Sequence, residues 1–264
     1  MDEDIPLEGG NLNAVLRRGD RVIRPAGLWS ATIHRLLRHA RERGVSWVPE
    51  PFGLDADGRE QLGFIPGEVA HGAPDWLWDE RLLVEVAQAL RQWHDASADF
   101  DRAGACWQSA ARSPQEVICH SDFAPYNCVF REGRDGCRHF VGAIDFDHCK
   151  PGPRLWDLAY TAYRFVPLMP ATDEPIVHAG DERATFDWLR QQARLRTFLD
   201  AYARHGQPIP GPSIADLLSA TVERLLDLAV FSDEAARRLD KPELARHAAM
   251  YRRHADWLNA RTGE

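Results

Sequence analysis

Two short polar segments of the chain carry side chains that can handle protons and metal ions. The first contains Asp122 and Asn127, five residues apart, and the second contains Asp145. Each segment follows a short apolar run of the kind that forms buried strands. Phosphoryl transfer from a nucleotide needs a carboxylate that orients the acceptor hydroxyl and takes its proton, with amide and carboxylate oxygens holding Mg²⁺. We therefore predict Asp122 as the catalytic base, and Asn127 and Asp145 as magnesium ligands.

Neighbouring side chains add to this interpretation and admit a second one. His120 is grouped with Asp122 as catalytic, with the expected task of fixing the loop by hydrogen bonds. Asp147 could contact a metal or an acceptor, or cap its own loop. A zinc or two-metal hydrolase site is the alternative, and its candidate ligands are His120, Asp122, Asp145, Asp147, His148 and Cys149. The His-x-His or His-Asp cluster that would begin such a site is missing, apart from an isolated His94-Asp95, which makes the hydrolase the weaker alternative.

The elements that must position these loops begin with a small β-rich region. A hairpin is predicted over residues 14–24, because apolar and charged residues flank a Gly-Asp turn. A helix is expected from Ser30 to Gly44 on the spacing of its apolar residues. Strands are predicted over residues 48–54 and 61–65.

Pro66-Gly67 breaks this pattern and predicts a hinge. Residues 1–66 are then one lobe and residues 67–264 a second, mainly helical lobe, with a helical subregion over residues 178–264. Helices are expected around the apolar stripe from Leu82 to Trp93, between 181 and 205, after a capped start at Ser213, and from Pro242 to near Trp257.

Length and composition exclude several classes of protein. The chain has 264 residues and a net charge of −8, with a pI of about 5.8, which disfavours nucleic-acid binding. It has no apolar run long enough to span a membrane, and its acidic start is unlike a secretory signal, so a cytoplasmic location is expected. Five cysteines without a Cys-x-x-Cys pair predict buried, reduced thiols. The oligomeric state is left open.

The two polar segments resemble the catalytic and metal-binding loops of the aminoglycoside phosphotransferase family. The resemblance rests on Asp122 with Asn127, on Ile144-Asp145-Phe146, and on the segment from Gly152 to Ala159. It implies an α+β, bilobal, protein-kinase-like fold with a small antiparallel sheet in the N-terminal lobe. It also implies ATP or GTP as co-substrate with Mg²⁺, and Asp157 as a structural support for the catalytic loop.

The nucleotide-binding side departs from the family pattern. The family's phosphate-covering loop corresponds to Gly9, Gly10 and Asn11, although a plain β-turn remains an alternative for that segment. Arg24 stands where the family usually has a phosphate-binding Lys, and His34 where the Glu that pairs with this Lys is expected. The resemblance places adenine against the backbone around Phe64 and Ile65, which complete the predicted nucleotide contacts: Gly9, Gly10, Asn11, Arg24, Phe64 and Ile65.

The acceptor is expected to be a hydroxyl of a small molecule. An aminoglycoside-like antibiotic is the family-level expectation, with resistance as the consequence. A macrolide, a choline-like amine, an amino-alcohol and a sugar are alternatives. Binding is expected between the catalytic loop and the C-terminal helices, and the candidate contacts are Asp147, Asp227, Asp233, Glu234, Tyr251 and Trp257. The substitutions at Arg24 and His34 also leave open a nucleotide-binding pseudokinase with a regulatory role.

Overall fold

A computed structural model describes residues 4–7, 15–70, 72, 74–170 and 187–261 of the chain. The chain forms two compact units, each built from two stretches of sequence. The first comprises residues 1–70 and 89–154, and the second residues 71–88 and 155–264. The predicted lobe boundary at residue 66 is therefore not the boundary between these units, because residues 89–154 belong with the N-terminal sheet.

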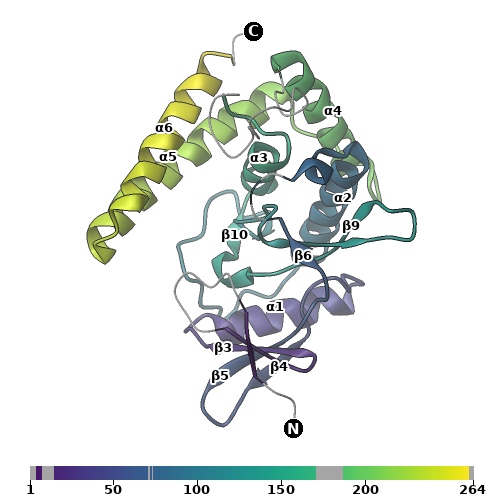
Figure 1. Cartoon of the computed structure of the whole chain (residues 1–264), viewed down its shortest axis with the longest axis vertical. Helices are drawn as coiled ribbons and strands as arrows, with labels where there is room; N and C mark the ends of the chain where they lie inside the picture. Colours follow the sequence, from purple (N-terminus) through teal and green to yellow (C-terminus); the bar gives the residue numbers. More distant parts are fainter. Residues whose placement is uncertain (1–3, 8–14, 71, 73, 171–186, 262–264) are drawn as a thin grey trace. The chain divides into compact units, whose positions relative to one another are not determined.

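The first unit begins with an antiparallel sheet and one helix (Figure 1). The strands run in the order β1-β2-β3-β5-β4, and α1 joins β3 to β4. Their bounds are β1 Ile5–Pro6, β2 Leu16–Arg18, β3 Arg21–Pro25, α1 Ser30–Glu42, β4 Pro51–Leu54 and β5 Arg59–Gly63. The predicted hairpin and helix are confirmed. The helix buries its apolar face, with Ile33, Leu36 and Leu37 fully inaccessible.

Strand β5 begins two residues earlier than the sequence predicted. The reason is the turn before it, where the carboxylate of Asp55 accepts hydrogen bonds from the backbone N–H groups of Asp57 and Arg59. Gly58 has a positive φ of 75° and closes this turn. Strand β5 therefore begins directly after Gly58, and Glu60 is part of the sheet.

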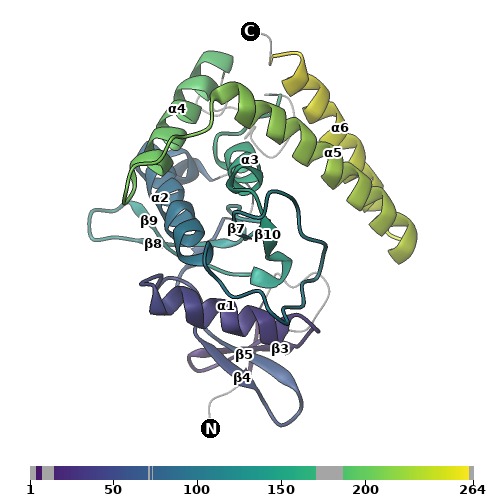
Figure 2. The same cartoon turned by 180° about the vertical axis from the view of Figure 1, so that it is seen from behind.

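The rest of the first unit holds the two polar loops (Figure 2). Strands β6 (Glu68–Val69), β8 (Cys128–Glu132) and β9 (Arg138–Ala143) form one antiparallel sheet in the order β6-β8-β9. Strands β7 (Val117–Cys119) and β10 (Lys150–Gly152) pair separately. A short 3₁₀ helix spans Phe146–His148. Both polar loops thus leave the ends of paired strands.

Helices dominate the second unit. Residues Asp75–Trp78 form a 3₁₀ turn before α2 (Glu80–Ser97), which crosses from the second unit into the first. The others are α3 (Arg154–Phe165), α4 (Trp188–Arg204), α5 (Ile214–Leu239) and α6 (Pro242–Asn259). The predicted cap at Ser213 forms a capping box with Asp216. The α+β class is confirmed.

Buried polar groups tie the second unit together. Arg194 donates to the carbonyls of Trp78 (2.8 Å) and Phe165 (3.0 Å), and burial lowers the pKa of its guanidinium to about 10. The Tyr163 hydroxyl and His254 Nδ1 lie 2.7 Å apart, and both side chains are fully buried.

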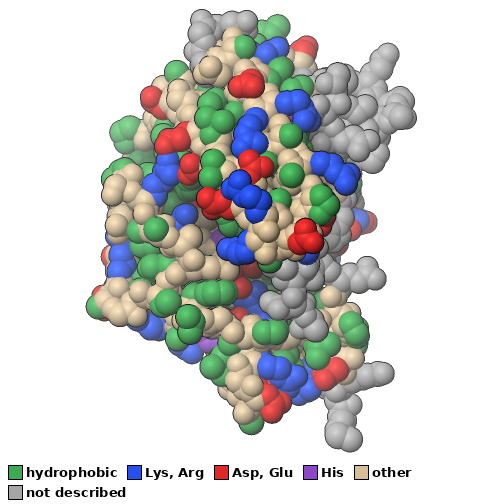
Figure 3. All heavy atoms as spheres, turned by 90° about the vertical axis from the view of Figure 1, so that its left-hand side faces the viewer, with side chains coloured by type: hydrophobic (Ala, Val, Ile, Leu, Met, Phe, Trp, Pro, Cys, Tyr) green, Lys and Arg blue, Asp and Glu red, His purple; other side chains and the backbone are tan. Residues whose placement is uncertain are grey.

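On the face drawn in Figure 3, basic and acidic side chains are interspersed with apolar ones.

Two sequence-level expectations about the chain's general character meet the structure here. The thiols of Cys119, Cys128 and Cys149 are buried as predicted, but Cys106 is exposed and Cys137 is half-buried, because both lie in loops. None of the helices in the described part of the chain combines the length and the apolar surface that crossing a bilayer requires.

The link between β5 and β6 gives a first prediction. Gly67 has a φ of +157°, and a Cβ there would lie 2.5 Å from the Phe130 carbonyl oxygen. We expect Gly67→Ala to lower the free energy of unfolding by about 2–4 kcal/mol, since backbone strain and a clash with backbone act together. Gly58→Ala is the matched control, because it has a positive φ and nothing within 4 Å, and it should cost about 1 kcal/mol. Urea unfolding measures both, and equal losses would contradict the role of the close approach.

Candidate active site

The catalytic loop starts where β7 ends and holds Asp122 by two side chains. The hydroxyl of Tyr126 donates to Asp122 Oδ1 (2.6 Å), and Asn127 Nδ2 donates to Asp122 Oδ2 (2.8 Å). Asp122 is half-buried. Burial raises the pKa of its carboxyl, and the hydrogen bond from Tyr126 opposes the rise. A carboxylate of increased basicity at a fixed position suits a general base.

The predicted metal loop (residues 144–149) lies beside the predicted catalytic loop (residues 120–127) because of strand pairing. In the β8–β9 ladder, Cys128 is opposite Ala143, and the Ile144 N–H donates to the Asn127 carbonyl (2.8 Å). Asp145 follows at once in a left-handed conformation, with φ 62°, and its side chain is 42% exposed. The pairing thus brings together the three residues that the sequence predicted to act together.

His120 links the two loops from beneath. Its Nε2 lies 3.1 Å from the Ile144 carbonyl oxygen, and its Nδ1 accepts from the Asp122 N–H (3.3 Å). The ring is fully buried between Phe123 and Phe146, with centroids 5.5 and 4.6 Å away. Both ring nitrogens are thus engaged with the backbone, as expected of a residue that fixes the loop. Its grouping with the catalytic residues stays a prediction.

Arg24 on β3 reaches the metal loop. Its Nε donates to Glu60 Oε2 (2.6 Å), its Nη2 donates to Asp147 Oδ1, and its Nη1 lies 3.7 Å from Asp145 Oδ1. One guanidinium thus faces three carboxylates, so the cluster has an excess of negative charge. Burial would lower the pKa of Arg24, but the carboxylates outweigh it and the pKa lies above its ordinary value.

Glu60 on β5 is the functional candidate that sequence reasoning missed. It is 1% exposed, and its Oε1 lies 2.9 Å from His34 Nε2 on α1. Burial alone would raise the pKa of Glu60, but its bonds to His34 and Arg24 hold it below the ordinary value. The predicted strand began at residue 61, which left Glu60 in the turn. The signal that could have found it is the register, since Arg24 and Glu60 are cross-strand partners.

The donor set suits Mg²⁺. Asn127 uses its amide nitrogen on Asp122, which leaves the amide oxygen for a metal, and Asp145 adds an accessible carboxylate. Hard oxygen ligands, few in number and completed by phosphate and water, are what Mg²⁺ prefers. Among the described residues, no group of three or more His, Cys, Asp or Glu side chains is arranged to hold a metal ion. The hydrolase alternative therefore finds no support in the geometry.

The predicted adenine contacts lie where β5 leads into β6. The Phe64 N–H donates to the Asp20 carbonyl (2.7 Å), and its ring lies 3.8 Å from the guanidinium carbon of Arg17. Ile65 packs against β9, where a Cβ on Gly142 would come within 2.8 Å of it. Gly9, Gly10 and Asn11 lie outside the described residues, so their role stays a prediction.

The predicted acceptor contacts are divided between the two compact units. Asp147 is bound to Arg24, and its contact with the acceptor stays a prediction. Asp233 on α5 bonds Arg252 on α6 and so joins these helices. Asp227 and Glu234 are exposed on the same face of α5 as Val230 and Phe231, given their spacing. Asp157 is buried in the first turn of α3, and its support of the catalytic loop remains a prediction.

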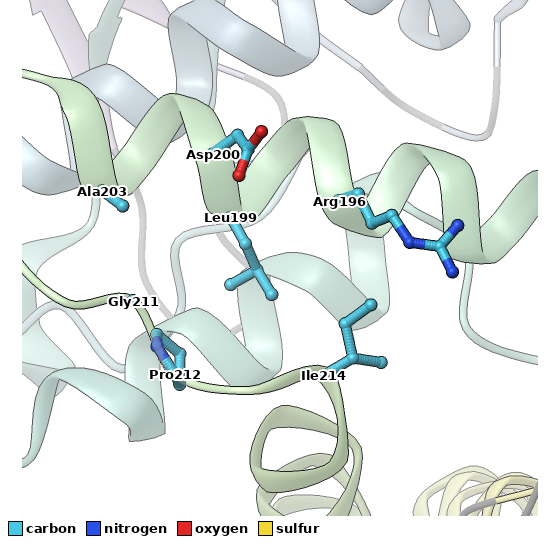
Figure 4. Close-up of a pocket in the computed structure, with 7 residues that line it drawn as sticks. All are labelled: Arg196, Leu199, Asp200, Ala203, Gly211, Pro212 and Ile214. Atoms are coloured by element: carbon cyan, nitrogen blue, oxygen red, sulfur yellow. The ribbon is translucent and has the colours of Figure 1, made fainter.

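A cavity of about 330 Å³ lies in the second unit, between α4 and the segment that leads into α5. Figure 4 shows Leu199 directed from α4 toward Pro212 and Ile214. None of the residues proposed for catalysis or metal binding lines it.

Comparison with known proteins finds a family match for the central part of the chain. Residues 75–196, which include both polar loops, match the model of the Phosphotransferase enzyme family. A curated relative, the trifolitoxin immunity protein of Rhizobium leguminosarum bv. trifolii, is 37% identical over 158 residues. That alignment covers 57% of this chain and 58% of the relative, so the chain spans little more than half of the relative's length.

Solved structures confirm the kinase-like fold. A choline/ethanolamine kinase family protein from Mesorhizobium loti matches with a TM-score of 0.60 at 16% identity, covering 97% of this chain and 87% of that one. The streptomycin–ATP complex of APH(2")-IIa matches with a TM-score of 0.54 at 16% identity, covering 95% and 93%. At such identities the likeness establishes the fold alone.

The proposed metal ligands can be tested by ligand-induced stabilisation. Mg²⁺ with ATP should raise the unfolding free energy of the wild-type protein by about 2.7 kcal/mol at a concentration about 100 times Kd. We expect Asp145→Asn to lose the part of this gain that depends on Mg²⁺, because the charged ligand is gone. Asp57→Asn, in the exposed turn before β5, is the control. Thermal unfolding with and without EDTA measures the effect, and an unchanged Mg²⁺-dependent gain in Asp145→Asn would contradict the assignment.

Proposed function

We propose that the protein transfers the γ-phosphoryl group of a nucleoside triphosphate to a hydroxyl of a small molecule. The observation that carries this proposal is the hydrogen-bonded arrangement of Asp122, Asn127 and Asp145. Asn127 binds Asp122 through its side chain and the residue before Asp145 through its carbonyl. Asn127, itself a proposed Mg²⁺ ligand, is thus bonded both to the proposed base and to the residue that precedes the second proposed ligand.

In the proposed reaction, Asp122 accepts a hydrogen bond from the acceptor hydroxyl and takes its proton. The acceptor oxygen bonds to the γ-phosphorus, and the bond from that phosphorus to the bridging oxygen breaks, which releases the nucleoside diphosphate. Arg24 binds the phosphates from the sheet. Asn127 and Asp145 would hold Mg²⁺, which neutralises phosphate charge when bound.

ATP is the proposed phosphoryl donor. The solved complex of the similar APH(2")-IIa contains ATP, which supports ATP, and GTP is the alternative. A nucleoside triphosphate donor also favours the cytoplasm as the place of reaction. A small-molecule acceptor requires no nucleic acid or membrane.

The proposed acceptor is a cationic small molecule such as an aminoglycoside antibiotic. Two observations support a cationic acceptor with some apolar surface. Similar structures are described as binding streptomycin, or as belonging to a choline/ethanolamine kinase family. In addition, Asp227 and Glu234 flank Val230 and Phe231, which are 54% and 56% exposed, on one face of α5. A macrolide or a sugar is an alternative acceptor.

Turnover across a panel of acceptors tests this function. We expect at least one aminoglycoside or amino-alcohol to raise release of ADP in the wild-type protein. Asp122→Asn should lower kcat about 10²- to 10⁴-fold, because the proton acceptor is lost, while Mg–ATP affinity stays within a few-fold. If no acceptor raises turnover above the level of Asp122→Asn although ATP binds, a regulatory pseudokinase is the better description.

A second candidate function is protection of a cell against a toxin. The observation that favours it is the 37% identity to the trifolitoxin immunity protein over 158 residues. The same chemistry would serve this function if the toxin carries a hydroxyl that Asp122 can activate.

Growth of a trifolitoxin-sensitive Rhizobium strain tests the second candidate. Cells that express the wild-type chain should grow at toxin concentrations that stop cells with an empty vector. Loss of protection with Asp122→Asn would tie immunity to phosphoryl transfer. Full protection by Asp122→Asn would indicate binding of the toxin instead, and no protection by the wild type would rule this candidate out.

A further inference from the structure

We infer that Glu60 is the positioning residue of the nucleotide site, and that its place on β5 is the reason why position 24 is arginine. The inference rests on the proposed function, since it concerns how Arg24 is presented to the phosphates. It rests on three connected side chains from different elements: Arg24 on β3, Glu60 on β5 and His34 on α1.

Glu60 is fixed at both of its oxygens. Oε2 accepts from Arg24 Nε at 2.6 Å, and Oε1 lies 2.9 Å from His34 Nε2. The side chains of Glu60 and His34 are 1% and 5% exposed, so water does not compete for them. A carboxylate bound from both sides cannot turn away, and it fixes the guanidinium that it binds.

The hydrogen-bond donors of Arg24 fall into two sets, one that binds Glu60 and one that can bind a phosphate. Nε bonds the buried Glu60, whereas the two terminal nitrogens lie toward Asp145 and Asp147, whose side chains are 42% and 22% exposed. The terminal nitrogens therefore stand at the accessible end of the cluster, beside the proposed metal ligand. Phosphate oxygens of a nucleotide can take hydrogen bonds from these nitrogens while Nε keeps Glu60.

A lysine at position 24 could not make this division. Glu60 is the direct cross-strand neighbour of Arg24, so it meets the side chain at the level of Nε, well before its tip. A lysine carries its donors on one terminal nitrogen and has none along its stem. With Glu60 at the level of the arginine Nε, a lysine would have to draw that one nitrogen back from the phosphates to reach the buried carboxylate.

His34 completes the arrangement for an electrostatic reason. It stands on α1 against Glu60, where a glutamate would put a second carboxylate next to the first. A histidine that donates from Nε2 satisfies Glu60 and leaves its charge for Arg24. The residues at positions 24, 34 and 60 are thus coupled. With the acid on the strand at position 60, position 24 requires an arginine and position 34 a side chain that is not acidic.

Calorimetric titration of the full chain with ATP and Mg²⁺ tests the coupling. Glu60→Gln keeps the shape but removes the charge and one of the two acceptor oxygens, and we expect it to weaken binding roughly 10- to 100-fold. Arg24→Lys should weaken binding to a similar degree although it keeps the charge. The triple change Arg24→Lys, His34→Glu, Glu60→Gln moves the acid to the helix and should recover most of the loss seen in Arg24→Lys.

Two controls separate positioning from stability. Glu132→Gln is the same substitution at the exposed end of β8, where Glu132 pairs with Arg138, and its ATP affinity should equal that of the wild type. In steady-state kinetics, Glu60→Gln should raise KM for ATP and leave KM for the acceptor unchanged. Should Glu60→Gln unfold early, Arg24→Lys and the triple variant still provide the comparison.

The outcomes distinguish this inference from the proposed function. ATP binding by Glu60→Gln that equals binding by Glu132→Gln would overturn the inference and leave the proposed function intact, as would wild-type affinity in Arg24→Lys. Failure of the triple variant to improve on Arg24→Lys would overturn the coupling. A wild-type protein that binds no nucleotide would instead overturn the proposed function.

Discussion

The candidate site depends on the pairing of β8 with β9. This ladder places the carbonyl of Asn127 against the N–H of Ile144 (2.8 Å), and His120 binds the Ile144 carbonyl from the other side. A shift of the register by one residue would turn Asp145 away from Asn127, because alternate residues of a strand point to opposite faces. The chemistry of the site is therefore specified by a backbone register, and the side chains only complete it.

Local strain accompanies this arrangement. Ser121 and Asp145 both adopt left-handed backbone conformations, with φ values of 68° and 62°, which cost about 1–2 kcal/mol for residues other than glycine. They lie on either side of His120, whose ring is buried between two phenylalanines and whose nitrogens engage both loops. The packing of His120 against Phe123 and Phe146 thus stabilises the unfavourable backbone conformations of Ser121 and Asp145.

The sequence was most informative where function depends on residues close together in the chain. The five-residue spacing of Asp122 and Asn127, and the capped or apolar starts of the helices, depend on local patterns, and the structure has these elements as predicted. Glu60 was missed because its position depends on where a turn ends and on which strand lies opposite. The tight turn fixed by Asp55 moved the start of β5 by two residues. Long-range pairing of that kind leaves no periodic pattern in a single sequence.

The same distinction explains why the reaction is better defined than the acceptor. Asp122, Asn127, Asp145, Arg24 and Glu60 all belong to the first compact unit, where strand pairing fixes their distances. The candidate acceptor contacts on α5 belong to the second unit and lie on a helix surface, where no strand pairing sets their positions. A helix face can exchange its exposed residues without disturbing its buried ones. Substrate preference can therefore change within such a fold while the proposed phosphoryl-transfer residues stay in place, and a motif that points to the reaction carries little information about the acceptor.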